Sequence, residues 1–198
     1  MPTGVKPRQQ QHVEAHRKIN LRKRLLTQAM PGAVYVPFCG DGDIALACYA
    51  DRKIFASDID PKRVATAKER LSTAVIFCAD CDEYPFAHIK ETIAIADFDA
   101  YANPYKAFVA WHAKTKLAKR VVIFFTDGER QSIKRHKKTI TLPDCALSVG
   151  NWRLQFNTYP RGTMLPFIAR IIAPKVITMT QHYLRGASGM VYMGVVAE

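Results

Sequence analysis

The sequence predicts an α/β protein built on a doubly wound, mostly parallel sheet of seven strands. Short β-branched apolar segments alternate with helical segments between residues 33 and 126, as in folds with parallel strands and right-handed crossovers. A glycine-containing turn follows the first apolar segment, and two strand-like segments joined by a short glycine-bearing link close the chain. Such a link favours a hairpin, so the last strand should be antiparallel. These observations together predict a Rossmann-like fold.

The first five expected strands are nearly all apolar, as is typical of strands covered by helices on both faces. They are residues 34–36, 53–57, 74–78, 92–96 and 120–126. The two strand-like segments that close the chain are residues 176–183 and 190–196.

The N-terminal part is read as a flexible arm, residues 1–11, and a basic helix over residues 12–29. The helix has a weak apolar face, formed by Ala15, Ile19 and Leu26. We therefore divide the chain into an arm and helix, residues 1–30, and a single domain, residues 31–198.

Helices are also predicted between the strands. A short one covers residues 44–49, and Asp60-Pro61 marks the start of the next, with the carboxylate as cap and proline in the first turn. Another is expected over residues 105–119. Residues 128–174 are basic and contain prolines, and we expect an irregular insertion there with a small core around Trp152, Phe156 and Tyr159.

The charge of the chain favours a polyanionic partner. Lys and Arg number 29 against 17 Asp and Glu, giving a net charge of +12, and neutralising phosphates releases condensed counterions. A merely solvated basic surface is the alternative. The positive residues cluster at 6–24 and 130–138, and the candidate nucleic-acid-binding residues are Arg17, Arg22, Lys134, Arg135, Lys137 and Lys138.

Other classes find little support. No apolar run approaches the ~18 residues of a membrane span, and the polar N-terminus lacks the apolar centre of a signal peptide, so we expect a cytoplasmic protein. Cys78 and Cys81 form a pair of thiols without a second Cys/His pair at matching spacing. Two thiols are too few for a closed zinc site, and we expect no metal.

The segment most informative about function is the strand, turn and helix over residues 34–49. It contains Gly40-x-Gly42-x-x-Ala45, where glycines permit unusual dihedrals and close approach of a ligand to the backbone. Asp58 lies 18 residues beyond Gly40 at the end of the second strand. A carboxylate there accepts hydrogen bonds from ribose hydroxyls, so the pattern predicts a nucleotide-cofactor site without deciding between NAD and other adenosine cofactors.

Three further acidic residues follow predicted strands. Asp80 ends the third strand, where an acceptor meets an adenine amine, and Asp97 and Asp99 end the fourth. Ligands of open α/β sheets bind at the carboxyl ends of the strands. We therefore expect Asp97, Asp99 and Tyr101 to point into the cleft.

These segments resemble a known family. Pro37-Phe38-Cys39-Gly40-Asp41-Gly42 looks like the Pro-Phe-Cys-Gly-x-Gly motif of class I S-adenosylmethionine-dependent methyltransferases that act on amino groups of DNA and RNA. The run Asp97-x-Asp99-Ala100-Tyr101-Ala102-Asn103-Pro104 is similar to a motif of tRNA guanine dimethyltransferases and to one of DNA amino-methyltransferases. Val36, Ala100 and Ala102 depart from the family pattern. The resemblance covers residues 33 to about 126.

The resemblance implies an S-adenosylmethionine-dependent enzyme that methylates an exocyclic amine of a base in RNA, with tRNA favoured, or in DNA. Asp99 would hold the amine hydrogens, Tyr101 would stack on the base, and Asp97 would orient the methionine ammonium or support the loop. The implied cofactor-binding residues are Pro37, Phe38, Cys39, Gly40, Gly42, Asp58, Ile59, Asp80 and Cys81.

Two rival functions remain open. An NAD-dependent oxidoreductase fits the glycine pattern but leaves the Asp97–Pro104 run and the charge without a role. A non-catalytic nucleic-acid-binding protein with the same fold fits the departures at Val36, Ala100 and Ala102.

Overall fold

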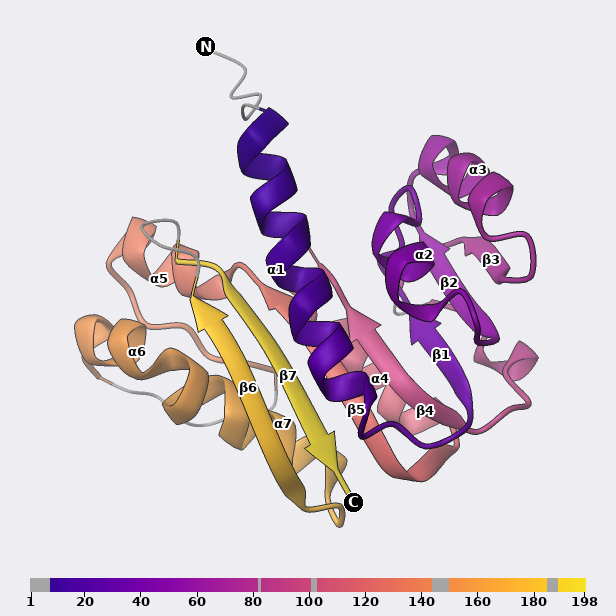
Figure 1. The fold of residues 1–198 in the computed structure, drawn as a ribbon. Helices are drawn as coiled ribbons and strands as arrows, with labels where there is room; N and C mark the ends of the chain where they lie inside the picture. The colour runs from indigo at the N-terminus through magenta and orange to yellow at the C-terminus, as the bar shows by residue number, and fades with distance from the viewer. Residues whose placement is uncertain (1–7, 82, 101–102, 144–149, 185–188) are drawn as a thin grey trace.

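The computed structural model describes residues 8–81, 83–100, 103–143, 150–184 and 189–198, and its centre is a seven-stranded sheet (Figure 1). The strand order is β3-β2-β1-β4-β5-β7-β6. Strands β1 to β5 are parallel, and β7 runs antiparallel to both β5 and β6. The predicted fold class is therefore confirmed. The strands are β1 Ala33–Val36, β2 Ile54–Asp58, β3 Val75–Cys78, β4 Ile93–Phe98, β5 Leu117–Asp127, β6 Ile177–Leu184 and β7 Val191–Ala197.

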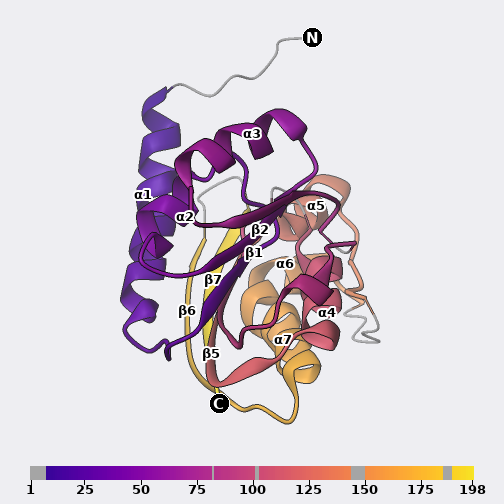
Figure 2. The same cartoon turned by 90° about the vertical axis from the view of Figure 1, so that its right-hand side faces the viewer.

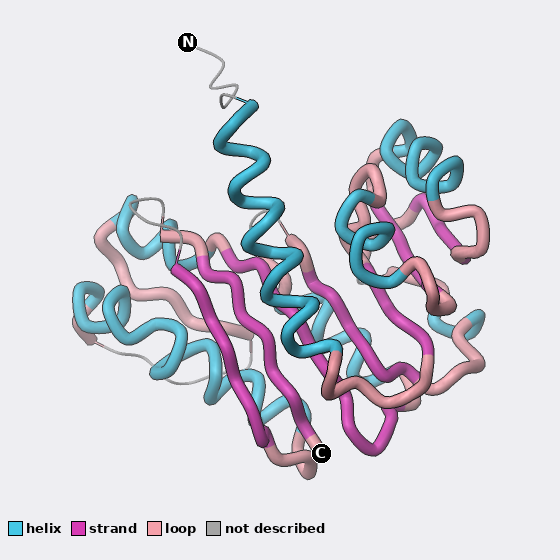
Figure 3. Tube along the Cα trace, in the orientation of Figure 1, coloured by secondary structure: helices cyan, strands magenta, loops and turns pink. Residues whose placement is uncertain are grey.

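Helices cover both faces of the sheet (Figure 2). One face carries α1 Arg8–Leu26, α2 Asp43–Tyr49 and α3 Pro61–Arg70. The opposite face carries α4 Tyr105–Lys114, α6 Trp152–Tyr159 and α7 Leu165–Ile172, while α5 Glu129–His136 follows β5 directly. Figure 3 shows the same alternation of helix and strand along the trace.

Three expectations about helix positions are wrong. Helix α1 begins at Arg8, within the segment 1–11 that was expected to be a flexible arm, and ends at Leu26. The segment 128–174 is not irregular, because it contains α5, α6, a π-helix over Pro160–Met164, and α7. Its prolines do not break these helices: Pro160 begins the π-helix, and Pro166 lies in the first turn of α7. Helix α4 ends at Lys114 rather than at residue 119, because β5 begins at Leu117.

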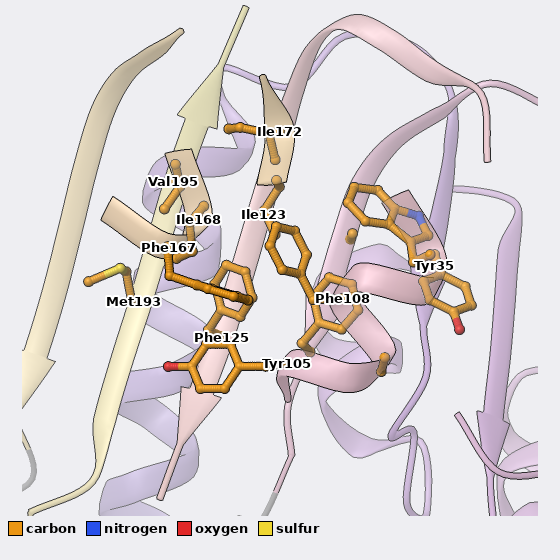
Figure 4. Close-up of a cluster of buried hydrophobic side chains, with 14 of the residues drawn as sticks. Tyr35, Tyr105, Phe108, Ile123, Phe125, Phe167, Ile168, Ile172, Met193 and Val195 are labelled. Atoms are coloured by element: carbon orange, nitrogen blue, oxygen red, sulfur yellow. The ribbon is translucent and has the colours of Figure 1, made fainter. Parts of the chain in front are cut away.

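An aromatic core fills the face between the sheet and helices α4 and α7 (Figure 4). Tyr35 of β1 lies parallel to Trp111 of α4 with ring centroids 6.5 Å apart, and Phe98 stacks on Phe125 at 5.4 Å. The small core expected around Trp152, Phe156 and Tyr159 is not separate: Tyr159 is buried in this main cluster, and Trp152 and Phe156 pack against it. This core lies on the sheet face opposite α1, and it includes Phe98 and Phe125 near the carboxyl ends of β4 and β5.

Helix α1 packs on the other face through a different surface from the one predicted. Leu21, Arg22 and Leu25 are buried, whereas Ala15, Ile19 and Leu26 are half-buried. Gly194 of β7 admits the helix closely, because a Cβ there would lie 2.3 Å from Leu25 Cδ1.

The buried face of α1 therefore includes a charged residue. Arg22 is only 1% exposed, and its assignment as a nucleic-acid-binding residue is wrong. The periodicity argument failed because it treated arginine as a residue that faces water, and Arg22 is instead paired inside the protein.

Candidate active site

The turn after β1 has the left-handed backbone that its glycines suggest. Gly40 has φ of 52° and Gly42 of 82°, values that favour glycine strongly. The Gly42 N–H donates to the Cys39 carbonyl at 2.9 Å, and the Cys39 N–H donates to the Ser57 carbonyl of β2 at 2.9 Å. The turn is therefore closed on itself and tied to the neighbouring strand before α2 begins.

Asp58, at the end of β2, holds two backbone segments together. Its Oδ2 accepts from the Gly40 N–H at 2.9 Å, and its Oδ1 accepts from the Asp60 N–H at 3.0 Å. Asp60 in turn caps α3 by accepting from the Lys62 N–H. A carboxylate oxygen accepts more than one hydrogen bond, so Asp58 retains acceptor capacity toward a ligand above the turn.

A cavity of about 340 Å³ lies over this turn at the carboxyl ends of the strands. It brings together five residues predicted for the site, Phe38, Cys39, Gly40, Asp58 and Asp99. The sequence reasoning missed other lining residues, namely Lys18, Asp41, Asp43, Ile44, Arg63, Ala100, Thr126 and Met190. The signal for Lys18 was its position four residues before Arg22, on the face of α1 that turns inward.

The remaining predicted cofactor residues do not line this cavity. The Pro37 carbonyl accepts from the buried Ser57 hydroxyl, which supports the turn from beneath. Ile59 follows Asp58 and is 71% exposed. Asp80 and Cys81 line a second cavity of about 410 Å³ with Asn103 and Lys106.

Asp99 is held by a cation from α1. Its Oδ1 accepts from the Lys18 ammonium at 2.5 Å, and the Arg22 guanidinium lies 3.9 Å from its Oδ2. Burial by itself would raise the pKa of Asp99, but Lys18 and then Arg22 keep that pKa below its ordinary value of 3.8. The carboxylate is therefore ionised at neutral pH.

Asp97 does not enter the cavity, so its assignment to the cleft is wrong. It is 0% exposed and accepts from Arg22 Nε and Nη2 at 2.6 Å each and from the Tyr49 hydroxyl at 2.7 Å. Burial opposes the charge of Arg22, but Asp97 beside it raises the pKa of the guanidinium. Asp97 anchors α1 and α2 to β4 instead of meeting a ligand.

A second buried acidic group ends β5. Asp127 Oδ2 accepts from the hydroxyls of Tyr105 and Tyr159, and its Oδ1 accepts from the Glu129 N–H at 2.7 Å. Burial raises the pKa of Asp127 to about 6, against the lowering effect of the two tyrosine hydroxyls. The sequence reasoning missed this group, which joins α4, α5 and α6.

The predicted basic residues other than Arg22 lie on the surface. Lys134 and Arg135 end α5, and Lys137 and Lys138 follow it; all four are exposed, and we call them the α5 basic cluster. Arg17 on α1 is exposed as well. In Figure 1, α5 and the N-terminal half of α1 both lie at the end of the sheet where β4 and β5 finish. Tyr101 lies outside the described residues.

Some chemistries have no support at this site. Burial, with Asp58 adding to it, raises the pKa of Cys39 to about 12, so its thiol stays protonated at neutral pH and is a poor nucleophile. Among the described residues, no three His, Cys, Asp or Glu side chains gather as a metal would require.

No described helix has both the length and the apolarity needed to cross a membrane.

The arrangement of this sheet is shared with solved methyltransferases. N-methyltransferase NodS from Bradyrhizobium japonicum WM9, in complex with S-adenosyl-L-homocysteine, superposes with a TM-score of 0.60 at 10% identity, covering 93% of this chain and 86% of NodS. The chain has the fold of class I methyltransferases.

Other solved structures agree. Plantazolicin methyltransferase BpumL, in complex with a pentazolic desmethylPZN analogue and S-adenosyl-L-homocysteine, gives a TM-score of 0.57 at 12% identity, covering 93% of this chain and 84% of BpumL. A putative rRNA-methylase from Clostridium thermocellum gives 0.56 at 10% identity, covering 91% and 95%. The sequence matches no protein-family model and no curated protein.

Proposed function

We propose that the protein is an S-adenosylmethionine-dependent methyltransferase that acts on an exocyclic amine of a base in RNA or DNA. The observation that carries the proposal is the cavity over the Gly40–Gly42 turn, which has the Asp58 carboxylate and the ionised Asp99 carboxylate on its wall. The Asp58 carboxylate suits the ribose of an adenosine cofactor, and the Asp99 carboxylate suits the amine that receives the methyl group.

The residues present fit the cofactor. Asp58 is held in place by two backbone N–H groups and keeps acceptor capacity for ribose hydroxyls. The exposed Ile59 beside it offers an apolar surface to a planar base. Asp80, in the second cavity, is an acceptor suited to an adenine amine. Two of the structural neighbours carry S-adenosyl-L-homocysteine.

The residues also fit the chemistry. The bound cofactor supplies an already activated methyl group on a sulfonium, so this chain needs neither a metal nor a covalent nucleophile. Its task is to orient a weakly nucleophilic amine and to favour the positive charge that develops on it. Asp99 is a preorganised carboxylate that can accept the amine hydrogens, and the exposed side chains around the cavity mouth bind the rest of the substrate.

Charge favours a nucleic acid as that substrate. The chain carries a net charge of +12. Helix α5, from which the α5 basic cluster extends, lies at the end of the sheet where β4 and β5 finish, and the exposed Arg17 precedes Lys18, which lines the cavity. Phosphates neutralised there would supply binding free energy without regard to sequence. One structural neighbour is described as a putative rRNA-methylase, which supports RNA as the first polymer to test.

The strand order argues against the oxidoreductase alternative. Dinucleotide-binding Rossmann sheets have the order 3-2-1-4-5-6, whereas here β7 is inserted antiparallel between β5 and β6. The non-catalytic alternative differs from the proposal only in turnover. It therefore becomes an outcome of the experiment.

The test combines cofactor binding with methyl transfer. S-adenosylmethionine should bind in calorimetry, and Asp58→Ala should weaken the binding by about 1–3 kcal/mol because it removes the acceptor of the ribose hydroxyls. Asp51→Ala, which removes an exposed carboxylate outside the cavity, is the matched control and should leave the affinity unchanged.

Labelled methyl transfer to bulk tRNA, rRNA and DNA then separates the remaining possibilities. Equal affinities of wild type and Asp58→Ala would reject the cofactor site. Cofactor binding without transfer to any of the three polymers would favour the non-catalytic nucleic-acid-binding protein.

A further inference from the structure

The acceptor carboxylate of the cavity is already occupied by a side chain of the protein itself. Lys18 Nζ lies 2.5 Å from Asp99 Oδ1 and 5.3 Å from the centre of the Tyr192 ring. Lys18 and Asp99 are 20% and 13% exposed, whereas Arg22 and Asp97 beneath them are 1% and 0% exposed. Two ion pairs thus join α1 to β4, and only the upper one is open to water.

The two pairs differ in how freely they can separate. Arg22 is fixed by three hydrogen bonds, two to Asp97 and one from Nη1 to the Lys18 carbonyl at 3.0 Å. The backbone of α1 at Lys18 is therefore held, while the Lys18 side chain ends in a partly exposed ammonium. A lysine ammonium is a compact point charge with three rotatable donors on a flexible four-carbon stem, so it can reach another anion nearby without movement of the backbone.

The Lys18 ammonium opposes the role proposed for Asp99. It occupies one carboxylate oxygen and neutralises the charge that would favour a cationic amine in the transition state. A target amine has the full benefit of Asp99 only when Lys18 has moved away. A substrate can cause that movement only if it interacts differently with the two positions of Lys18, and a phosphate group near the cavity mouth has this property.

We propose that Lys18 is a specificity-determining positioning residue. Its ammonium moves from Asp99 to a phosphate of the nucleic-acid substrate, so the Asp99 carboxylate is free to accept the target amine only when a phosphorylated substrate is bound. This inference rests on the proposed function. Under this proposal the basic surface of α1 takes part in substrate selection, because binding of the phosphate by Lys18 also releases the Asp99 carboxylate.

The experiment compares substrates with and without phosphate. Methyl transfer is measured for adenosine, guanosine and cytidine, for their 5′-monophosphates, and for a short mixed oligonucleotide. Wild type should favour the phosphate-bearing member of the pair for the base that is modified. In Lys18→Gln the ratio of kcat/KM for nucleotide over nucleoside should fall about tenfold, with faster transfer to the nucleoside, while Lys18→Arg should retain the preference.

Lys23→Gln is the matched control, since Lys23 is exposed on the same helix and carries the same charge. It should leave the ratio unchanged. A second measurement needs no variant: inorganic phosphate added to wild type should accelerate transfer to the nucleoside, and an equal ionic strength of chloride should not.

The outcomes separate this inference from the proposed function. Transfer to polymer by wild type together with an unchanged ratio in a folded Lys18→Gln protein would overturn the role of Lys18 alone. If Lys18→Gln fails to fold, absence of phosphate activation in wild type would overturn it equally. Absence of transfer to every nucleic acid would overturn both.

Discussion

The buried ion pair between α1 and β4 gives the sharpest prediction about stability. Asp97 is fully buried and receives three hydrogen bonds, two from Arg22 and one from Tyr49. Arg22→Met removes the only guanidinium that contacts Asp97 among the described residues and leaves a buried carboxylate with one donor. Breaking a buried pair from one side costs about 3–5 kcal/mol, a large share of the roughly 5–15 kcal/mol that stabilises a typical domain.

A double-mutant cycle isolates the pair. Asp97→Leu alone should destabilise the fold to a similar extent, because it leaves Arg22 charged and buried. Arg22→Met/Asp97→Leu should cost much less than the sum of the single changes, because replacing both charges by apolar groups is often nearly neutral. Tyr49→Phe removes one hydrogen bond to a charged group and should cost about 1.5–3 kcal/mol.

Urea unfolding at pH 7, followed by circular dichroism, measures these free energies. The matched control is Arg17→Met, the same substitution at an exposed position of α1, with an expected effect within about 0.5 kcal/mol. Equal midpoints and slopes for Arg22→Met and Arg17→Met would refute the reasoning. So would additive effects of Arg22→Met and Asp97→Leu, since they would show that the two charges do not interact.

Three further predictions concern pH, turnover and salt. The pKa of Asp127 is raised to about 6 from an ordinary 3.8, so its favourable contribution to the unfolding free energy is complete below about pH 4 and is lost as pH rises through 6. Relative to Asp127→Asn, wild type should lose up to about 3 kcal/mol of unfolding free energy between pH 4 and 7. Parallel stability curves of the two proteins would contradict this. Asp99→Asn should lower kcat by about 10²–10³ with nearly unchanged cofactor affinity, and a full-speed variant would exclude Asp99 as the acceptor. Neutralising the α5 basic cluster should reduce the slope of log affinity against log salt by up to about 0.9 for each duplex phosphate that the variant no longer neutralises, and an unaltered slope would leave the cluster as ordinary solvated surface.

The elements whose causes are local were readable from the sequence. The Gly40–Gly42 turn, Asp58 at the end of β2 and the Asp60 cap of α3 each depend on residues within one or two turns of chain, and the structure places all of them where expected. The sheet was equally readable, because alternation of apolar strands with helices and the closing pair of strands determine its topology. The segment 128–174 was misjudged because first-turn prolines were taken as helix breakers.

Pairings between distant residues were decided only by the tertiary structure. Arg22 and Asp97 are 75 residues apart, and Lys18 and Asp99 are 81 apart, so no local pattern indicates that either pair will meet. Asp97 and Asp99 look equivalent in sequence, yet one is sealed beneath α1 and the other faces the cavity. The sequence alone indicated the acidic groups at the ends of β2 and β4. Packing of α1 against β7 and β4 decided which of those groups a cation neutralises, because burial of a charge is stable only where the fold brings an opposite charge to it.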